Sequence, residues 1–159
     1  MILVTVGTQI PFDRLIHYVD KWAAESQERS SVVAQVGKSN FHSENISVLT
    51  SVEPEQFEEY ITKSDFIISH AGMGSILTAL RVKKPIIIFP RSAALGEHRN
   101  DHQMATARSF ENVEGVYVAT TEDDLLEILN NKEKLCSGVL NDSMEYKKLL
   151  ENITNLVSE

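Results

Sequence analysis

Three segments of this chain carry the glycines and polar side chains that could bind a phosphorylated ligand. Residues 7–9 read Gly-Thr-Gln, residues 69–75 read Ser-His-Ala-Gly-Met-Gly-Ser, and residues 97–103 read Glu-His-Arg-Asn-Asp-His-Gln. Glycines let the backbone approach a phosphate closely, and the free amides that open a helix carry about half a positive charge. The first two segments therefore favour a diphosphate as the ligand.

Each glycine segment also has a simple structural explanation. Tight turns between a strand and a helix need glycine whether or not a ligand binds there. Neither segment is a G-x-G-x-x-G fingerprint or a G-x-x-x-x-G-K-[ST] P-loop, so dinucleotide binding and ATP hydrolysis lack their main support. Two such corners in one small chain nevertheless favour a binding site.

The third segment allows three interpretations. His98 and His102 are four residues apart and could share a metal ion, but the zinc-protease pattern needs Glu where this chain has Arg99. We therefore predict no metal site and no cofactor. The residues at 100 and 101 could simply cap a helix. The density of polar groups favours contacts with sugar hydroxyls, made by Asn100, His102 and Gln103.

Short apolar runs alternate with helical patterns along the chain. The sequence predicts strands at residues 2–6, 32–36, 46–49, 65–69, 85–89 and 115–119. It predicts helices that start behind Pro11, at Pro54, after residue 75, near residue 100, at the capping box of Thr121 and Asp124, and at residue 143. This alternation predicts one α/β domain over residues 1–159, doubly wound and Rossmann-like, with a parallel sheet of about six strands. Ligands of such sheets bind beyond the carboxyl ends of the strands, where all three polar segments fall.

Composition narrows the classes of partner. A chain of 159 residues fits one domain, and its net charge of −8 argues against a nucleic-acid partner. No apolar run is long enough to cross a bilayer, and the first residues lack the features of a signal peptide. Cys136 is the only cysteine, so no intrachain disulfide forms. We expect a cytoplasmic protein.

Together these segments resemble the C-terminal domain of family 28 glycosyltransferases. The resemblance rests on residues 70–80 (His-Ala-Gly-Met-Gly-Ser-Ile-Leu-Thr-Ala-Leu), 84–90 (Lys-Pro-Ile-Ile-Ile-Phe-Pro) and 100–103 (Asn-Asp-His-Gln). The opening residues 4–9 (Val-Thr-Val-Gly-Thr-Gln) and 11–15 fit the same group, so the resemblance covers about residues 1–120. Within the family the chain looks most like the stand-alone catalytic subunit of two-part UDP-GlcNAc transferases and its bacterial capsule and exopolysaccharide counterparts.

The resemblance implies the C-terminal half of a GT-B glycosyltransferase, which binds a UDP-sugar and inverts the anomeric centre without a tightly held metal. It implies that the diphosphate is held by Gly72, Met73, Gly74 and Ser75. Gly7 and Thr8 would close over the phosphates or face the acceptor, and the donor sugar would meet Asn100, His102 and Gln103. Family members commonly carry Glu for the ribose where this chain has Thr78, so Glu97 is a substitute ligand to consider.

The expected reaction also needs a base and a stabilised leaving group. His70 is the candidate base within this chain, although a histidine at a strand end is as often a structural hydrogen-bond partner. The start of the helix near Gly74, with Arg91 or Arg99, would stabilise the departing UDP. The base could instead lie on a membrane-anchored subunit that binds the acceptor. A C-terminal helix at residues 142–159 would dock onto that subunit or pack on its own domain.

We therefore expect transfer of a hexose or N-acetylhexosamine from a UDP-sugar to a lipid-linked glycan, at the inner face of the membrane. A non-catalytic subunit that binds sugar nucleotide or stabilises a transferase would keep the same phosphate segments, so it remains an alternative. A fragment of a sugar-nucleotide epimerase is disfavoured, because such epimerases need two domains in one chain and internal carboxylates that are not found here.

Overall fold

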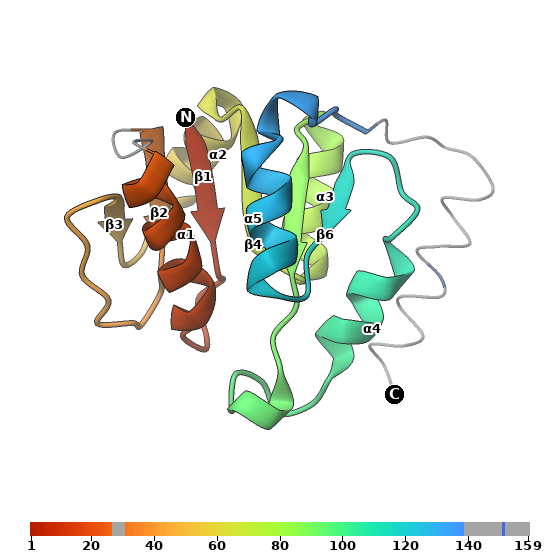
Figure 1. The fold of residues 1–159 in the computed structure, drawn as a ribbon, viewed down its shortest axis with the longest axis horizontal. Coiled ribbons are helices and arrows are strands. Elements are labelled where there is room, and N and C mark those ends of the chain that lie inside the picture. Colours follow the sequence, from red (N-terminus) through yellow and green to blue (C-terminus); the bar gives the residue numbers. More distant parts are fainter. Residues whose placement is uncertain (27–30, 139–150, 152–159) are drawn as a thin grey trace.

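The strands form one parallel sheet at the centre of the protein (Figure 1). The computed structural model describes residues 1–26, 31–138 and 151. Within these residues the sheet has six strands in the order β3-β2-β1-β4-β5-β6. Their bounds are Ile2–Thr5 (β1), Val32–Gln35 (β2), Ser47–Leu49 (β3), Phe66–His70 (β4), Ile86–Phe89 (β5) and Val116–Val118 (β6). Every neighbouring pair runs parallel.

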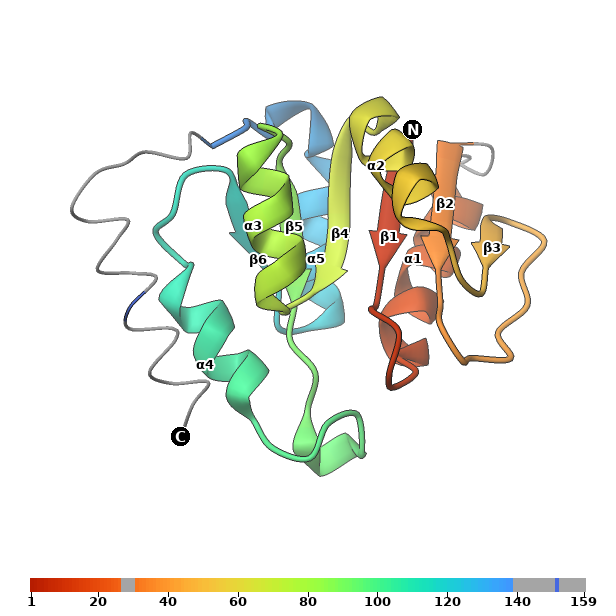
Figure 2. The same ribbon diagram turned by 180° about the vertical axis from the view of Figure 1, so that it is seen from behind.

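Helices cover both faces of this sheet. Helices α1 and α5 lie in front of it in Figure 1, and α2 and α3 lie on the opposite face in Figure 2. The helices are Asp13–Ser26 (α1), Pro54–Lys63 (α2), Met73–Arg81 (α3), His102–Ser109 (α4) and Glu122–Asn130 (α5), with short 3-10 turns at Ala93–Leu95 (η2) and Lys132–Lys134 (η3). The predicted doubly wound α/β fold is confirmed.

The core has two layers because alternate side chains of a strand point to opposite faces of the sheet. Val4 and Ile68 belong to the cluster that includes Leu15 of α1 and Leu125 of α5. On the other face, residues of β1, β4 and β5 pack against α3 and α4: Leu3, Ile67, Ile86, Ile88, Ile76, Leu80, Ala107 and Phe110. Strands covered on both faces read as continuous apolar runs, which is why the sequence marked them clearly.

The predicted strands agree with the structure to within one residue at either end. The predicted cap of α5 is also confirmed, because the Thr121 hydroxyl accepts a hydrogen bond of 3.1 Å from the Asp124 amide. Helix α4 begins at His102, two residues later than expected, since the preceding residues form turns. The C-terminal helix expected at residues 142–159 lies outside the described residues. Among the described helices, none is long and apolar enough to cross a membrane.

The fold determines where a ligand can bind. Strand β1 lies between β2 and β4, so the chain winds outward in both directions from the middle of the sheet. The loops that follow β1 and β4 diverge at this reversal, which leaves an open space at the carboxyl edge. This edge is at the bottom of Figure 1, where the loops after β1 and β5 extend.

Candidate functional site

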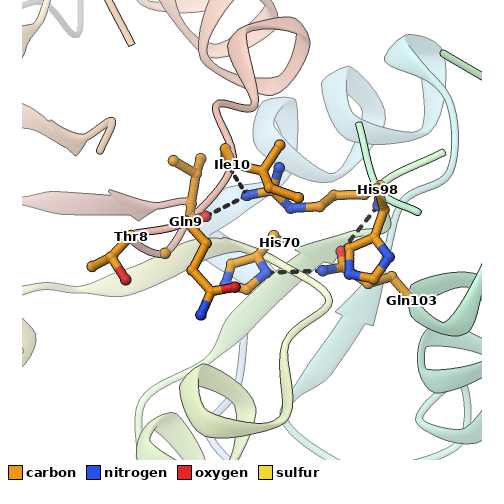
Figure 3. Close-up of a pocket in the computed structure, with 9 residues that line it drawn as sticks. Thr8, Gln9, Ile10, His70, His98 and Gln103 are labelled. Atoms are coloured by element: carbon orange, nitrogen blue, oxygen red, sulfur yellow. Dashed lines mark hydrogen bonds between the residues drawn. The ribbon is translucent and has the colours of Figure 1, made fainter. Parts of the chain in front are cut away.

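A cavity of about 250 Å³ lies at this carboxyl edge, where β1, β4 and β5 end (Figure 3). It is lined by Val6, Gly7, Thr8, Gln9, Ile10, His70, Arg91, His98 and Gln103. Five of these residues were expected at the site from the sequence, namely Gly7, Thr8, His70, Arg91 and Gln103, and the fold brings them together from four separate segments. No carboxylate is among the described residues that line the cavity, so its surroundings favour an anion.

The His70 ring, at the end of β4, is held between two glycines. A Cβ atom added at Gly72 would lie 2.3 Å from Cε1 of the ring, and one at Gly7 would lie 3.3 Å from Nε2. Gly7 also has a φ of +76°, which residues with a side chain adopt at a cost. Both positions therefore require glycine to leave room for the imidazole, in addition to any role in phosphate binding.

Gln103 joins the ends of β4 and β5 to the first turn of α4. Its Oε1 accepts hydrogen bonds from the amides of Ala71 (3.2 Å) and Arg91 (3.0 Å). Its Nε2 lies 3.2 Å from Nδ1 of His70, and a dashed line marks this contact in Figure 3. Only 8% of Gln103 is exposed, so its carboxamide is an internal connector as well as part of the cavity wall.

Arg91, directly after β5, shapes the loop that follows β1. Its guanidinium donates to the carbonyls of Val6 (2.5 Å), Ile10 (2.7 Å) and Pro11 (3.1 Å), and also to that of Glu97 (3.2 Å). Arg91 is 3% exposed. The expectation that it contacts a departing UDP therefore gives way to a different role, because four carbonyls already occupy the guanidinium. Its positive charge still lies beside the cavity.

Glu97 shapes the neighbouring loop. Its carboxylate accepts a bidentate pair of 2.8 Å hydrogen bonds from Arg14 of α1 and a third bond of 2.9 Å from the Ser92 amide. The bond to Glu97 in turn raises the pKa of Arg14. The expected role of Glu97 as a sugar or ribose ligand finds no support in this geometry, because both carboxylate oxygens are occupied and Glu97 does not line the cavity.

The start of α3 lies next to His70. Gly72 is the N-cap residue, no side chain caps this helix, and its first turn holds no acidic residue. The first amides of a helix have no intrahelical acceptor, so those of Met73, Gly74 and Ser75 are open to a ligand. The Thr78 hydroxyl donates to the Gly74 carbonyl (2.7 Å) within the helix. None of these residues lines the cavity itself, and Gly72 adjoins it through the His70 ring.

The start of α4 combines capping with the cavity wall. The Asn100 side chain accepts from the His102 amide (3.1 Å), and Asp101 is the N-cap residue. Of the three residues expected to contact the sugar, only Gln103 lines the cavity. Asn100 therefore bonds the first amide of α4 from the position before the N-cap, while the side chain of Asp101 does not cap the helix.

Four cavity residues had no ligand contact assigned to them from the sequence: Val6, Gln9, Ile10 and His98. Gln9 and Ile10 stand in an exposed loop that has no periodic pattern to mark them. His98 was considered only as a metal ligand, and the loop conformation fixed by Glu97 brings it to the cavity. Among the described residues, no group of three or more His, Cys, Asp or Glu side chains is placed to hold a metal ion.

A second hollow, of about 420 Å³, adjoins the first and shares Thr8 with it. It lies beyond the ends of β2 and β3 and is lined by Thr8, Gly37, Lys38, Ser39, Asn40, Thr50 and Ser51. The two hollows together extend along the carboxyl edge of the sheet.

The model of the glycosyltransferase family 28 C-terminal domain matches residues 1–158. The UDP-N-acetylglucosamine transferase subunit ALG13 of Yarrowia lipolytica is 28% identical over 115 residues, which cover 62% of this chain and 56% of that protein. A Clostridium botulinum UDP-N-acetylglucosamine–N-acetylmuramyl-(pentapeptide) pyrophosphoryl-undecaprenol N-acetylglucosamine transferase is 32% identical over 104 residues, 65% of this chain and 25% of that enzyme.

A solution NMR structure of ALG13 has the same fold, with a TM-score of 0.65, 19% identity, and coverage of 99% of this chain and 96% of that one. In sequence, the chain spans about half the length of the first curated relatives that it matches.

Proposed function

The chain belongs to the glycosyltransferase family 28 C-terminal domain family, and from this premise we propose that it is the donor-binding part of an inverting glycosyltransferase. The proposed donor is a UDP-sugar, with UDP-N-acetylglucosamine first, because the names of the matched relatives specify that donor. The proposed acceptor is a lipid-linked glycan.

One observation carries this proposal: a cavity without carboxylates lies beside a helix start that no side chain caps. The open amides of α3, the buried charge of Arg91 and the imidazole of His70 all favour an anion there. We propose that the diphosphate and its sugar occupy the first hollow and that the rest of the nucleotide extends into the adjoining hollow at Thr8. The family match makes a nucleotide sugar the best candidate for that anion.

The proposed chemistry is a single displacement. An acceptor hydroxyl oxygen bonds to the anomeric carbon on the face opposite UDP, and the bond from that carbon to the diphosphate oxygen breaks. The electron pair leaves with UDP, where hydrogen-bond donors aimed at the diphosphate stabilise the developing charge. The proton of the acceptor hydroxyl passes to a base.

We propose that this base lies on a partner. Burial, with the positive charges of Arg91 and His98 adding to it, lowers the pKa of His70 to about 4. A group with so low a pKa is a weak proton acceptor near neutral pH. We propose that the described cavity is one wall of a cleft, and that a membrane-associated subunit at the cytoplasmic face supplies the other wall, the acceptor and the base. Residues 142–159 are the proposed docking segment for it.

Isothermal titration of the purified chain tests the donor site. UDP and four sugar nucleotides (UDP-GlcNAc, UDP-glucose, UDP-galactose and UDP-glucuronate) are compared with UMP. UDP and at least one UDP-sugar should bind about tenfold or more tightly than UMP, because UMP lacks the second phosphate, worth about 1.4 kcal/mol or more. Equal affinities for UDP and UMP, or no heat with any of them even beside the partner, would refute the proposal.

A transfer assay separates a catalytic from a merely stabilising subunit. The chain is reconstituted with its candidate partner in membranes, and sugar transfer from the donor identified by titration is measured for wild type and Ser75→Ala. The variant should retain the complex, measured by co-purification, and lose transfer in proportion to its loss of UDP affinity. Transfer that persists when UDP no longer binds would favour the non-catalytic alternative.

A further inference from the structure

We propose that Gln103 is a positioning residue that fixes the His70 ring as its Nε2–H tautomer, so that the imidazole is a hydrogen-bond donor and not a base. The tautomer follows from contacts within this chain. The identity of the oxygen that receives the hydrogen bond, a diphosphate or sugar oxygen, rests on the proposed function.

The orientation of the Gln103 carboxamide is the first step. Two backbone amides, those of Ala71 and Arg91, point at the same carboxamide atom at 3.2 and 3.0 Å. An amide can only donate, so this atom must be the oxygen, and its two lone pairs are then filled. A flipped carboxamide would set its NH₂ group against two N–H donors. The NH₂ group of Gln103 must therefore face His70.

The second step concerns the ring nitrogens. The Gln103 NH₂ group lies 3.2 Å from Nδ1 of His70 and can only donate to it. Nδ1 must therefore be unprotonated, and the single proton of the neutral ring is on Nε2. The ring is neutral near pH 7 because burial, aided by the charges of Arg91 and His98, lowers its pKa to about 4.

The third step is the direction of the Nε2–H group. The ring lies between Gly72 and Gly7, and Nε2 is the ring atom closest to the position of a Cβ at Gly7. Both His70 and Gly7 line the cavity. Among the described residues, none accepts a hydrogen bond from Nε2. The donor is thus held rigidly at the cavity wall and is available to a ligand oxygen.

This arrangement changes the role expected for His70. A general base must offer a lone pair to the acceptor hydroxyl, yet the free lone pair of this ring is at Nδ1, where Gln103 uses it. Nε2, which faces the cavity, already carries a proton. His70 can therefore donate to a ligand oxygen in the ground state and the transition state, whereas removal of a proton falls to another group.

Nitrogen-15 NMR of the histidine side chains tests the tautomer directly. The chain holds five histidines, and the His70 signals are those missing from His70→Gln. In the wild type without ligand at pH 7, His70 should show a protonated Nε2 and an unprotonated Nδ1. A proton on Nδ1, or on both nitrogens, would overturn the inference without any need for a Gln103 variant.

Gln103→Glu then tests whether Gln103 sets the tautomer of His70. A carboxylate keeps the acceptor for the Ala71 and Arg91 amides but presents a second acceptor to Nδ1, so the His70 proton should move to Nδ1 or the ring should gain a second proton. Asn100→Asp is the matched control, because it adds the same charge nearby at a carboxamide that contacts the His102 amide instead of His70. An unchanged tautomer in Gln103→Glu, or the same change in both variants, would overturn the inference.

Titration with UDP measures the consequence for the ligand. Gln103→Glu should bind UDP about tenfold or more weakly, whereas Asn100→Asp should lose about threefold or less. If wild type shows the Nε2–H tautomer but no UDP binding, the proposed function fails and the tautomer assignment stands. If UDP binds while wild-type His70 is protonated on Nδ1, the donor role of His70 is refuted and the proposed function stands.

Discussion

Two helices of this protein begin at the same edge of the sheet and satisfy the same physical requirement in different ways. Helices α3 and α5 each start just after a parallel strand, and each presents amides that lack an intrahelical acceptor. At α5, Thr121 caps the Asp124 amide, and the Asp124 carboxylate accepts from the Thr120 amide and hydroxyl, each at 3.1 Å. At α3, the N-cap residue is Gly72 and no side chain caps the helix.

The first turns of α3 and α5 also differ in their number of acidic residues. The first turn of α5 holds three acidic residues, which complement the positive end of the helix dipole: Glu122, Asp123 and Asp124. The first turn of α3 holds none. The start of α5 is thus saturated by its own side chains, while the start of α3, left open beside a cavity, is available to an anionic ligand. Helix α2 also lacks a side-chain cap, so a missing cap indicates a binding site only where a cavity adjoins the helix start, as at α3.

Filling the space between the start of α3 and the His70 ring should have the largest effect on UDP affinity. In Gly72→Ala the new Cβ would collide with the His70 ring, 2.3 Å away, so the ring or the helix start must shift. We expect UDP affinity, measured by titration, to fall about 100-fold or more, equivalent to about 3 kcal/mol. Gly74→Ala is the comparison, since a Cβ there meets no protein atom within 4 Å and so adds a methyl group to the same helix start without displacing the His70 ring. If both variants bind UDP equally well, the space around His70 does not matter for the ligand.

Acid should affect the two helix starts in separate pH ranges. The folded-state pKa of His70 lies near 4, below its ordinary value of 6.5, so the unfolded chain binds the extra proton and stability is lost as pH falls from about 6.5 to 4. The Thr120 amide and neighbouring hydroxyls lower the pKa of Asp124 below its ordinary 3.8, so its contribution is lost only in stronger acid.

Urea unfolding at pH 7 and pH 5 measures how much of the free energy of unfolding depends on the neutral His70 ring. Between these pH values the free energy of unfolding of wild type should fall by about 2 kcal/mol more than that of His70→Gln. Each unit of pKa shift corresponds to about 1.4 kcal/mol. The comparison with His70→Gln removes the contribution of the other histidines. Equal losses in both proteins would show that His70 is not buried as a neutral ring.

Making α3 resemble α5 should separate stability from binding. Ser75→Asp places a carboxylate in the first turn of α3, where the helix dipole should stabilise the fold by about 0.3–1 kcal/mol. The same charge should weaken UDP binding about tenfold, or about 1.4 kcal/mol, because it competes with the phosphates. Ser75→Asn has the same shape without the charge and serves as the control. Unchanged UDP affinity in Ser75→Asp would place the diphosphate elsewhere.

The fold and part of the site could be predicted because their signals are local. Strands buried on both faces appear as apolar runs, and the Thr121 cap depends on residues three apart. The topology then requires Gly7 and His70 to meet, because β1 and β4 are neighbours in the sheet.

The roles of Arg91 and Glu97 could not be predicted in this way. Their partners are distant in the sequence: Arg14 is 83 residues from Glu97, and Val6 is 85 residues from Arg91. No spacing rule connects such positions, since the contacts exist only after both loops have folded. A polar run near a site therefore predicts where polar groups gather, and the tertiary structure decides which of them face the ligand.

The smallest effect on UDP affinity is expected at α5, which Thr121 caps. Thr121→Ala removes the hydroxyl that accepts from the Asp124 amide and should cost about 1 kcal/mol of the free energy of unfolding. Thr121→Ser keeps a hydroxyl and should restore most of that stability. UDP affinity should stay the same in both variants, because α5 contributes no residue to the cavity. A loss of UDP binding in Thr121→Ala that exceeds its loss of stability would show that the start of α5 is also part of the ligand site, and the contrast with α3 would fail.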